Sequence, residues 1–215
     1  MAVGGVGIVA SRINLADCDA AERRARVDLA AAHRLAVHYG YLEGIDNHFT
    51  LLLPGHADRP DVQCVLHTHM PYATALSMLE DPALLMASQN AIGFDGLVAL
   101  CDYAGFALDS SEGARMARAL GNKTVLLLLR NHGVVTTGTS VADAFNTLYF
   151  FERAAMTQIL AQSSGLAVRC VPGPVLQHAV EQYTAAAKVE GLDRIELHFA
   201  ALKRMLDRRE PDYAD

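Results

Sequence analysis

The sequence predicts an α/β fold in a single globular domain. Its 215 residues are 52% hydrophobic and 20% charged, which is enough apolar material for one substantial core. Segments with helical spacing of apolar residues alternate with short apolar runs typical of strands, and no internal repeat or low-complexity linker separates them. We therefore expect one domain over residues 1–215, with a core over about 20–165 and C-terminal helices over about 174–208.

A long helix and two strands are expected at the start of the chain. Residues 17–39 carry apolar side chains at helical spacing, include Asp17 or Asp19 as the N-cap, and end just before Gly40. The segment NHFTLLLPG (47–55) predicts a strand closed by a Pro-Gly turn, and DVQCVLHTH (61–69) predicts a second strand. Pro71 then favours the first turn of a short helix.

The following elements alternate in the same way. A short strand at 96–100 precedes DSSE, whose capping-box spacing predicts a helix that begins at Asp109. The apolar run TVLLLL (124–129) predicts a buried strand, and GVVTTG (133–138) predicts another strand after a bend. Capping spacing recurs at Ser140, before a long helix, and after a Pro-Gly-Pro turn the remainder is expected to be helical.

Charge and cysteine content exclude several classes of protein. The net charge is −6 and the positive residues are scattered, so the basic surface of a nucleic-acid-binding protein is missing. The four cysteines form no C-x-x-C pair, which argues against a disulfide framework or a cysteine zinc cluster. No secretory signal and no transmembrane run are evident. We expect a soluble cytoplasmic protein that binds a small molecule, without nucleic-acid or membrane partners.

Two histidines in VLHTHMP are the first candidate metal ligands. On a strand, His67 and His69 project from the same face. His132, in RNHG after the second apolar strand, is the third candidate. Three neutral imidazoles would leave an open position on Zn2+, Mn2+, Fe2+ or Co2+ acting as a Lewis acid. An H-x-H pair alone is also compatible with packed histidines. The helix that begins at Pro71 would leave free backbone N–H groups that favour a bound carboxylate or phosphate.

Three segments together resemble the class II aldolase/adducin superfamily, namely VQCVLHTHMP, LLLLRNHGVVTTGTSVADAF and NHFTLLLPG. The resemblance extends from about Asp28 to Gly165. It implies a three-layer α/β/α domain with a largely antiparallel central sheet. It also implies that His67, His69 and His132 hold a divalent ion, with Zn2+ the expected one.

The resemblance implies two alternative functions. One is a lyase that performs aldol cleavage or decarboxylation of a small oxo- or hydroxy-acid through a metal-stabilised enediolate. The other is a non-catalytic adducin-like module for assembly or partner binding that retains the histidines. Aldolases of the family form tetramers with active sites between subunits, so a homo-oligomer is expected.

The chain departs from the family pattern in two places, of which the first is near Arg59. PGHAD continues directly into RPDVQ near Arg59, where the family usually has several tens of further residues. In the aldolases the missing piece carries the acidic residue that completes the metal site and transfers protons. The nearest acids in this sequence are Asp58, Asp61 and Glu80, and each fits a solvated turn or helix end better.

The remaining candidate residues have weaker signals. In NHFT, His48 and Thr50 take the positions of the aldolase residues that contact a substrate phosphate, which resembles the adducin-like branch and disfavours a phosphorylated sugar. His48 and Tyr72 are candidate catalytic residues, although a backbone-bonded histidine and a packed helical tyrosine are the alternatives. Thr50 and Gln89 are candidate substrate contacts, and Tyr103 is a further candidate near the site.

Overall fold

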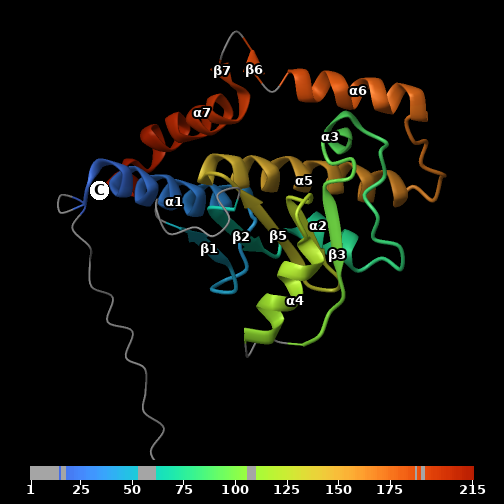
Figure 1. Ribbon diagram of the computed structural model, residues 1–215, viewed down its shortest axis with the longest axis horizontal. Coiled ribbons are helices and arrows are strands. Elements are labelled where there is room, and N and C mark those ends of the chain that lie inside the picture. The colour runs from blue at the N-terminus through green and yellow to red at the C-terminus, as the bar shows by residue number, and fades with distance from the viewer. Residues whose placement is uncertain (1–14, 16–17, 53–61, 106–109, 187, 190–191) are drawn as a thin grey trace, which may run out of the picture.

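The protein forms a five-stranded mixed sheet with helices on both faces (Figure 1). The computed structural model describes residues 15, 18–52, 62–105, 110–186, 188–189 and 192–215. The helices are α1 (Ala20–Tyr39), α2 (Pro71–Ser77), α3 (Gln89–Ile92), α4 (Ser110–Leu120), α5 (Val141–Gln162), α6 (Gly173–Ala185), α7 (Arg194–Arg209) and a 3-10 turn, η2 (Pro211–Ala214). The strands are β1 (His48–Leu51), β2 (Cys64–Thr68), β3 (Val98–Cys101), β4 (Leu126–Leu129), β5 (Gly133–Gly138), β6 (Lys188–Val189) and β7 (Leu192–Asp193).

The sheet has the strand order β1-β2-β5-β4-β3. Among the described strands of this sheet, each neighbouring pair is antiparallel except β3 and β4, which are parallel. A separate two-stranded hairpin joins β6 and β7. The register places Thr68 opposite Val134, so the end of β2 lies beside the start of β5.

Two apolar layers enclose the sheet. The main core lies between one sheet face and helices α1, α2, α5 and α7, and it contains Leu35, Leu66, Leu126, Phe145, Phe151 and Phe199. On the opposite face, α4 packs against β3 and β4 through a smaller cluster with Leu127 and Leu129 at its centre. Figure 1 shows α1 and α5 on one side of the sheet and α4 on the other. The predicted three-layer α/β fold with a largely antiparallel sheet is therefore confirmed.

Local capping determines where the two longest helices begin. The Asp19 side chain accepts a hydrogen bond from the Glu22 N–H at 2.8 Å, and Gly40 ends α1 with a positive φ of 71°. The Ser140 hydroxyl accepts from the Asp143 N–H at 3.1 Å at the start of α5. These boundaries agree with the sequence prediction. The expected Pro-Gly turn and the expected cap at Asp109 lie outside the described residues.

The C-terminal region contains the predicted helices, together with a short hairpin that was not predicted. The structure has two helices, α6 and α7, separated by the β6–β7 hairpin. The second helix has its own N-cap, because the Asp193 carboxylate accepts from the N–H groups of Ile195 and Glu196. Pro172 and Pro174 begin α6 rather than form a separate turn, since proline is compatible with a first helical turn. The short helix α3 was also not predicted.

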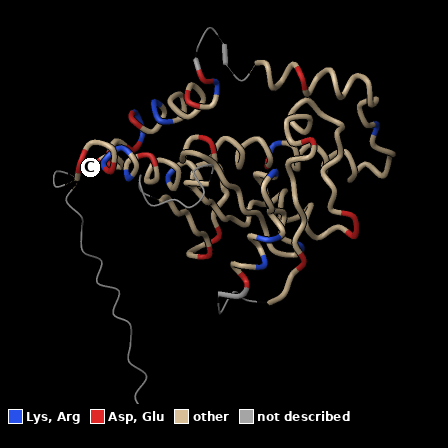
Figure 2. Tube along the Cα trace, in the orientation of Figure 1, with Lys and Arg blue, Asp and Glu red and all other residues tan. Residues whose placement is uncertain are grey.

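Charged residues are distributed without a basic stripe. Figure 2 shows lysine and arginine interspersed with aspartate and glutamate along the described trace. Among the described residues, no helix combines the length and the apolar character that a membrane crossing requires.

Candidate metal centre

Three histidines come together at one end of the sheet. His67 lies in β2, His69 follows β2 directly, and His132 lies in the connection between β4 and β5. One nitrogen from each ring can be chosen such that all three nitrogens lie within 4.8 Å of one another. The antiparallel pairing of β2 with β5 produces this convergence, because it places the end of one strand beside the start of the other.

A backbone hydrogen bond fixes the orientation of the His67 ring. Its Nδ1 lies 2.8 Å from the carbonyl oxygen of Val134, and because a carbonyl only accepts, Nδ1 carries the proton. The lone pair of the neutral ring is then on Nε2. Burial, and secondarily the neighbouring imidazoles, lower the pKa of His67 to about 4 despite the opposing effect of the Val134 carbonyl. His67 is therefore neutral near pH 7, as a metal ligand must be.

A carboxylate contacts one ring nitrogen of His69, and the other ring nitrogen has no partner among the described residues. Its Nδ1 lies 3.0 Å from Oε2 of Glu43, in the turn between α1 and β1. Its Nε2 is buried and has no hydrogen-bond partner among the described residues. A buried nitrogen without a partner is costly for a structural histidine, but it is the atom that a metal site requires. Glu43 was not predicted, since its contact with His69 depends on tertiary structure.

The loop that carries His132 is tightly built. Asn131 adopts a positive φ of 56°, and its N–H donates to the Ser77 carbonyl oxygen at 3.2 Å. A Cβ atom at Gly133 would lie 2.5 Å from the Thr68 carbonyl oxygen, so only glycine permits this approach. Burial, followed by the electrostatic interaction with His69, lowers the pKa of His132 below its ordinary value. The surroundings of His67 and His132 thus both favour the neutral imidazole.

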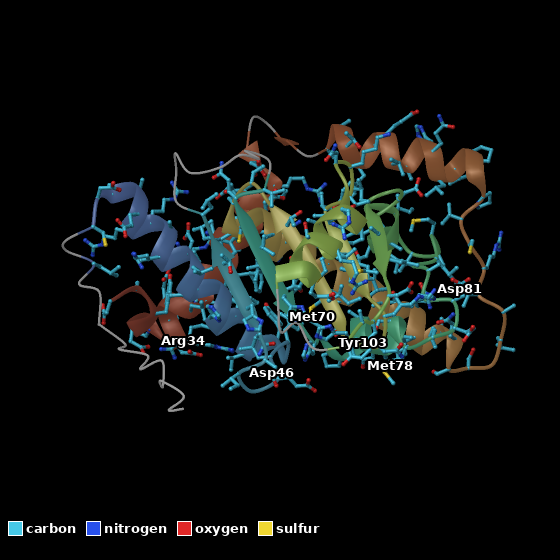
Figure 3. All side chains as sticks on the ribbon, turned by 60° about the horizontal axis from the view of Figure 1, so that its bottom comes forward. Arg34, Asp46, Met70, Met78, Asp81 and Tyr103 are labelled. Carbon is cyan, nitrogen blue, oxygen red and sulfur yellow. The ribbon has the colours of Figure 1, made fainter. Side chains whose placement is uncertain are left out.

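Two of the weaker candidates lie beside the histidines. His48 is opposite His67 in the β1–β2 register, and their rings stack with centroids 6.0 Å apart and an interplanar angle of 8°. Tyr103, which is 49% exposed, contacts His132 edge-on with ring centroids 6.0 Å apart. Figure 3 labels Tyr103 and Asp46 in the lower part of the molecule, and it also labels the buried Met70.

The two candidate substrate contacts, Thr50 and Gln89, have no direct contact with the histidines that the structure shows. Thr50 is exposed and shares the sheet face of His48, opposite Val65. Gln89 begins α3, which precedes the start of β3, whereas His132 follows the far end of the adjacent parallel strand β4. The contact of Gln89 with a substrate remains a prediction.

Tyr72 and Glu80 do not join the group of histidines. Tyr72 packs against the main core, and among the described residues no ring contact connects it to the histidines. Glu80 contributes its backbone oxygen, 3.3 Å from a guanidinium nitrogen of Arg130. Asp58 and Asp61 lie outside the described residues.

The prediction of free N–H groups for an anion at the start of α2 is wrong. The carboxylate of Glu152 in α5 accepts from the N–H groups of Tyr72 at 2.9 Å and Ala73 at 2.8 Å. Glu152 is buried, which raises its pKa, while the two N–H donors act in the opposite direction. The free donors predicted beside Pro71 are therefore already satisfied by the protein itself.

The three imidazoles suit a divalent transition metal. Neutral nitrogen ligands in this number are typical of zinc sites that keep a position open for water or substrate. In the described part of the chain, no carboxylate belongs to the group. The donor set thus fits a metal, and among the described residues it consists of the three histidines alone.

Comparison with known proteins places the chain in one family. The family described as "Class II Aldolase and Adducin N-terminal domain" matches residues 53–159. The crystal structure of an aldolase II superfamily protein from Pseudomonas syringae is 32% identical, has a TM-score of 0.83, and aligns over 93% of this chain and 98% of that one. Alpha-adducin from Rattus norvegicus is 35% identical over 74% of this chain, but only 22% of adducin is covered.

A further relative can be compared with the segment near Arg59, where this chain is expected to be shorter than its family. An aldolase class 2 protein from Pseudomonas aeruginosa is 29% identical over 247 residues, covering 92% of this chain and 95% of the relative. This alignment is longer than the chain of 215 residues, so the relative contains residues that are missing here. The predicted position of the gap, near Arg59, lies outside the described residues. Given the identity, coverage and fold shared with the P. syringae protein, this chain belongs to the class II aldolase/adducin superfamily.

Proposed function

We propose that the protein is a metal-dependent lyase that cleaves or decarboxylates a small oxo- or hydroxy-acid. The observation that carries the proposal is the buried Nε2 of His69, which has no partner in the described part of the chain and lies beside the rings of His67 and His132. These residues would hold the ion, for which Zn2+ is the first candidate. When bound, a divalent ion supplies a Lewis acid that stabilises the enediolate left by carbon–carbon bond cleavage.

Other properties of the site would support this function. The lowered pKa values of His67 and His132 keep their rings uncharged, so that they offer lone pairs rather than protons. His48 and Tyr103 flank the cluster and are our candidates for moving a proton. The Thr50 hydroxyl, on the face of His48, is our candidate for a substrate contact.

Metal content tests the proposal directly. Elemental analysis of freshly purified protein should find close to one transition-metal ion per chain. His132→Ala should lose most of it, whereas His178→Ala, which removes an exposed histidine of α6, should keep it. Full occupancy retained in each single alanine variant of the three candidate ligands would overturn the metal site.

A second candidate function is a non-catalytic adducin-like module. Two observations favour it, namely the absence of a carboxylate from the described histidine group and the 35% identity to alpha-adducin. The metal-loaded protein should therefore be assayed with small aldol and carboxylated substrates. Turnover that disappears in His132→Ala supports the lyase, whereas bound metal without turnover across both substrate classes supports the module.

We also propose that the chain is one domain over residues 1–215 and assembles as a cytoplasmic homo-oligomer, with a tetramer as the expected form. Helix α6 has no buried residue in the single chain, and it exposes Val175 and Tyr183. Apolar side chains on a lightly packed helix favour coverage by another copy. Light scattering coupled to size-exclusion chromatography measures the assembly, and a monomer at all concentrations would contradict this proposal.

A further inference from the structure

The contact between Glu43 and His69 suggests how the candidate metal ligand is oriented. We infer that Glu43 is a positioning residue that holds His69 with Nδ1 protonated and Nε2 free for the metal. Oε2 of Glu43 lies 3.0 Å from Nδ1, while Nε2 on the other side of the ring is buried and unpaired among the described residues. The inference rests on the proposed metal site, because it assigns the cause of that site's geometry.

Hydrogen-bond chemistry selects one form of the His69 ring. A carboxylate oxygen accepts, so the short contact places the proton on Nδ1 and leaves a lone pair on Nε2. The other neutral tautomer would put a carboxylate against a lone pair and leave an N–H donor buried without an acceptor. A carboxylate that fixes a ligating histidine in this way is a general feature of metal sites.

An ordinary surface ion pair explains the contact less well. Glu43 is 72% exposed on its side chain, but the His69 side chain is only 15% exposed. The other side of the ring is also unlike a surface ion pair, because its Nε2 is buried without a partner among the described residues. The ring lies beside those of His67 and His132, with centroids 5.0 and 4.8 Å away.

The turn between α1 and β1 holds Glu43 in position. The Asn47 side chain accepts from the Glu43 N–H at 3.4 Å and donates to the Gly44 carbonyl at 3.5 Å. The Asp46 N–H donates to the Glu43 carbonyl at 3.0 Å, and Gly44 has a positive φ of 57°. The asparagine of the NHFT segment therefore contributes to the turn that presents Glu43 to His69.

Three variants separate the role of Glu43 from a general effect on the turn. Glu43→Ala removes the acceptor, Glu43→Gln keeps an acceptor oxygen without the charge, and Asp46→Ala alters an exposed acid in the same turn. Competition with a chromophoric chelator should show Zn2+ affinity reduced by about 10- to 100-fold in Glu43→Ala. Glu43→Gln should recover a large part of this loss, and Asp46→Ala should bind as the unmodified protein does.

The tautomer provides a readout that does not depend on metal. In the metal-free protein, 15N spectra of the histidine rings, assigned with a His69→Gln variant, should show His69 protonated at Nδ1. Glu43→Ala should shift this proton toward Nε2, and Glu43→Gln should not. An unchanged tautomer in Glu43→Ala overturns the inference. If the unmodified protein binds no Zn2+, the proposed function fails, whereas the spectra still decide whether Glu43 sets the ring.

Discussion

Gly133 permits the close approach of the segments that carry the histidines. A Cβ atom there would lie 2.5 Å from the Thr68 carbonyl oxygen and 2.9 Å from Cδ2 of His69. Both distances are below van der Waals contact, so a larger residue must displace the backbone or the imidazole ring. We predict that Gly133→Ala lowers the free energy of unfolding by about 1–3 kcal/mol. Because the His69 ring moves, Zn2+ affinity should fall by roughly tenfold, measured by chelator competition.

Gly113 offers a matched control for this prediction. It lies in α4, and apart from the backbone of its own helix no described atom lies within 4 Å of a Cβ added there. Gly113→Ala should keep the Zn2+ affinity and raise the unfolding free energy by about 0.5–1 kcal/mol, because alanine favours the helix. Equal Zn2+ affinity in both variants would show that the glycine contact does not determine the position of His69.

The residues of the site could be predicted only in part. Alternation along a strand was enough to place His67 and His69 on one side, and the position of His132 after an apolar strand made it a candidate. Their convergence depends on the pairing of β2 with β5, which no local pattern specifies. Glu43 was missed for the same reason, since its hydrogen bond to His69 spans 26 residues of sequence.

At the scale of elements, α2 depends on another helix for its N-cap. Met70, at the N-cap position, makes no side-chain hydrogen bond, and the carboxylate of Glu152 accepts from the first free N–H groups instead. We predict that Glu152→Ala lowers the unfolding free energy by about 2–4 kcal/mol, because it leaves two N–H donors without acceptors in a buried site. Urea denaturation followed by circular dichroism measures the change.

Two further variants specify the mechanism of this capping. Glu152→Gln retains one acceptor oxygen but directs an amide toward the second N–H, so its loss should be smaller than that of Glu152→Ala. Arg153→Ala removes an exposed neighbour on the same helix and should change stability by less than about 0.5 kcal/mol. A loss in Arg153→Ala as large as in Glu152→Ala would contradict the capping role.

Elements with local signals were predicted better than those set by tertiary contacts. Asp19 and Ser140 cap their own helices, and both boundaries were predicted from the sequence. The cap of α2 comes from Glu152, far along the chain, and the sequence suggested free N–H groups there. The hairpin between α6 and α7 was also missed, because its strands have two residues each and are too short to show an alternating pattern.

At the scale of the whole molecule, the candidate site connects parts of the sheet that are distant in sequence. His67 and His69 belong to β2 and its end, while His132 precedes β5. Global unfolding must separate these ligands, since no local segment contains all three. Metal binding should therefore stabilise the entire fold rather than one loop.

This coupling gives a prediction for thermal unfolding. An ion that binds only the folded state stabilises it by about 2.7 kcal/mol when free Zn2+ is 100 times the Kd. For a chain of 215 residues, that free energy corresponds to a rise in Tm of roughly 5–10 °C. Differential scanning calorimetry of the chelator-treated protein, with and without Zn2+, should show this rise in the unmodified protein and in His178→Ala. His132→Ala should show little or none, because the remaining pair binds weakly and constrains only the end of β2. An equal rise in His132→Ala would place the stabilising ion elsewhere in the molecule.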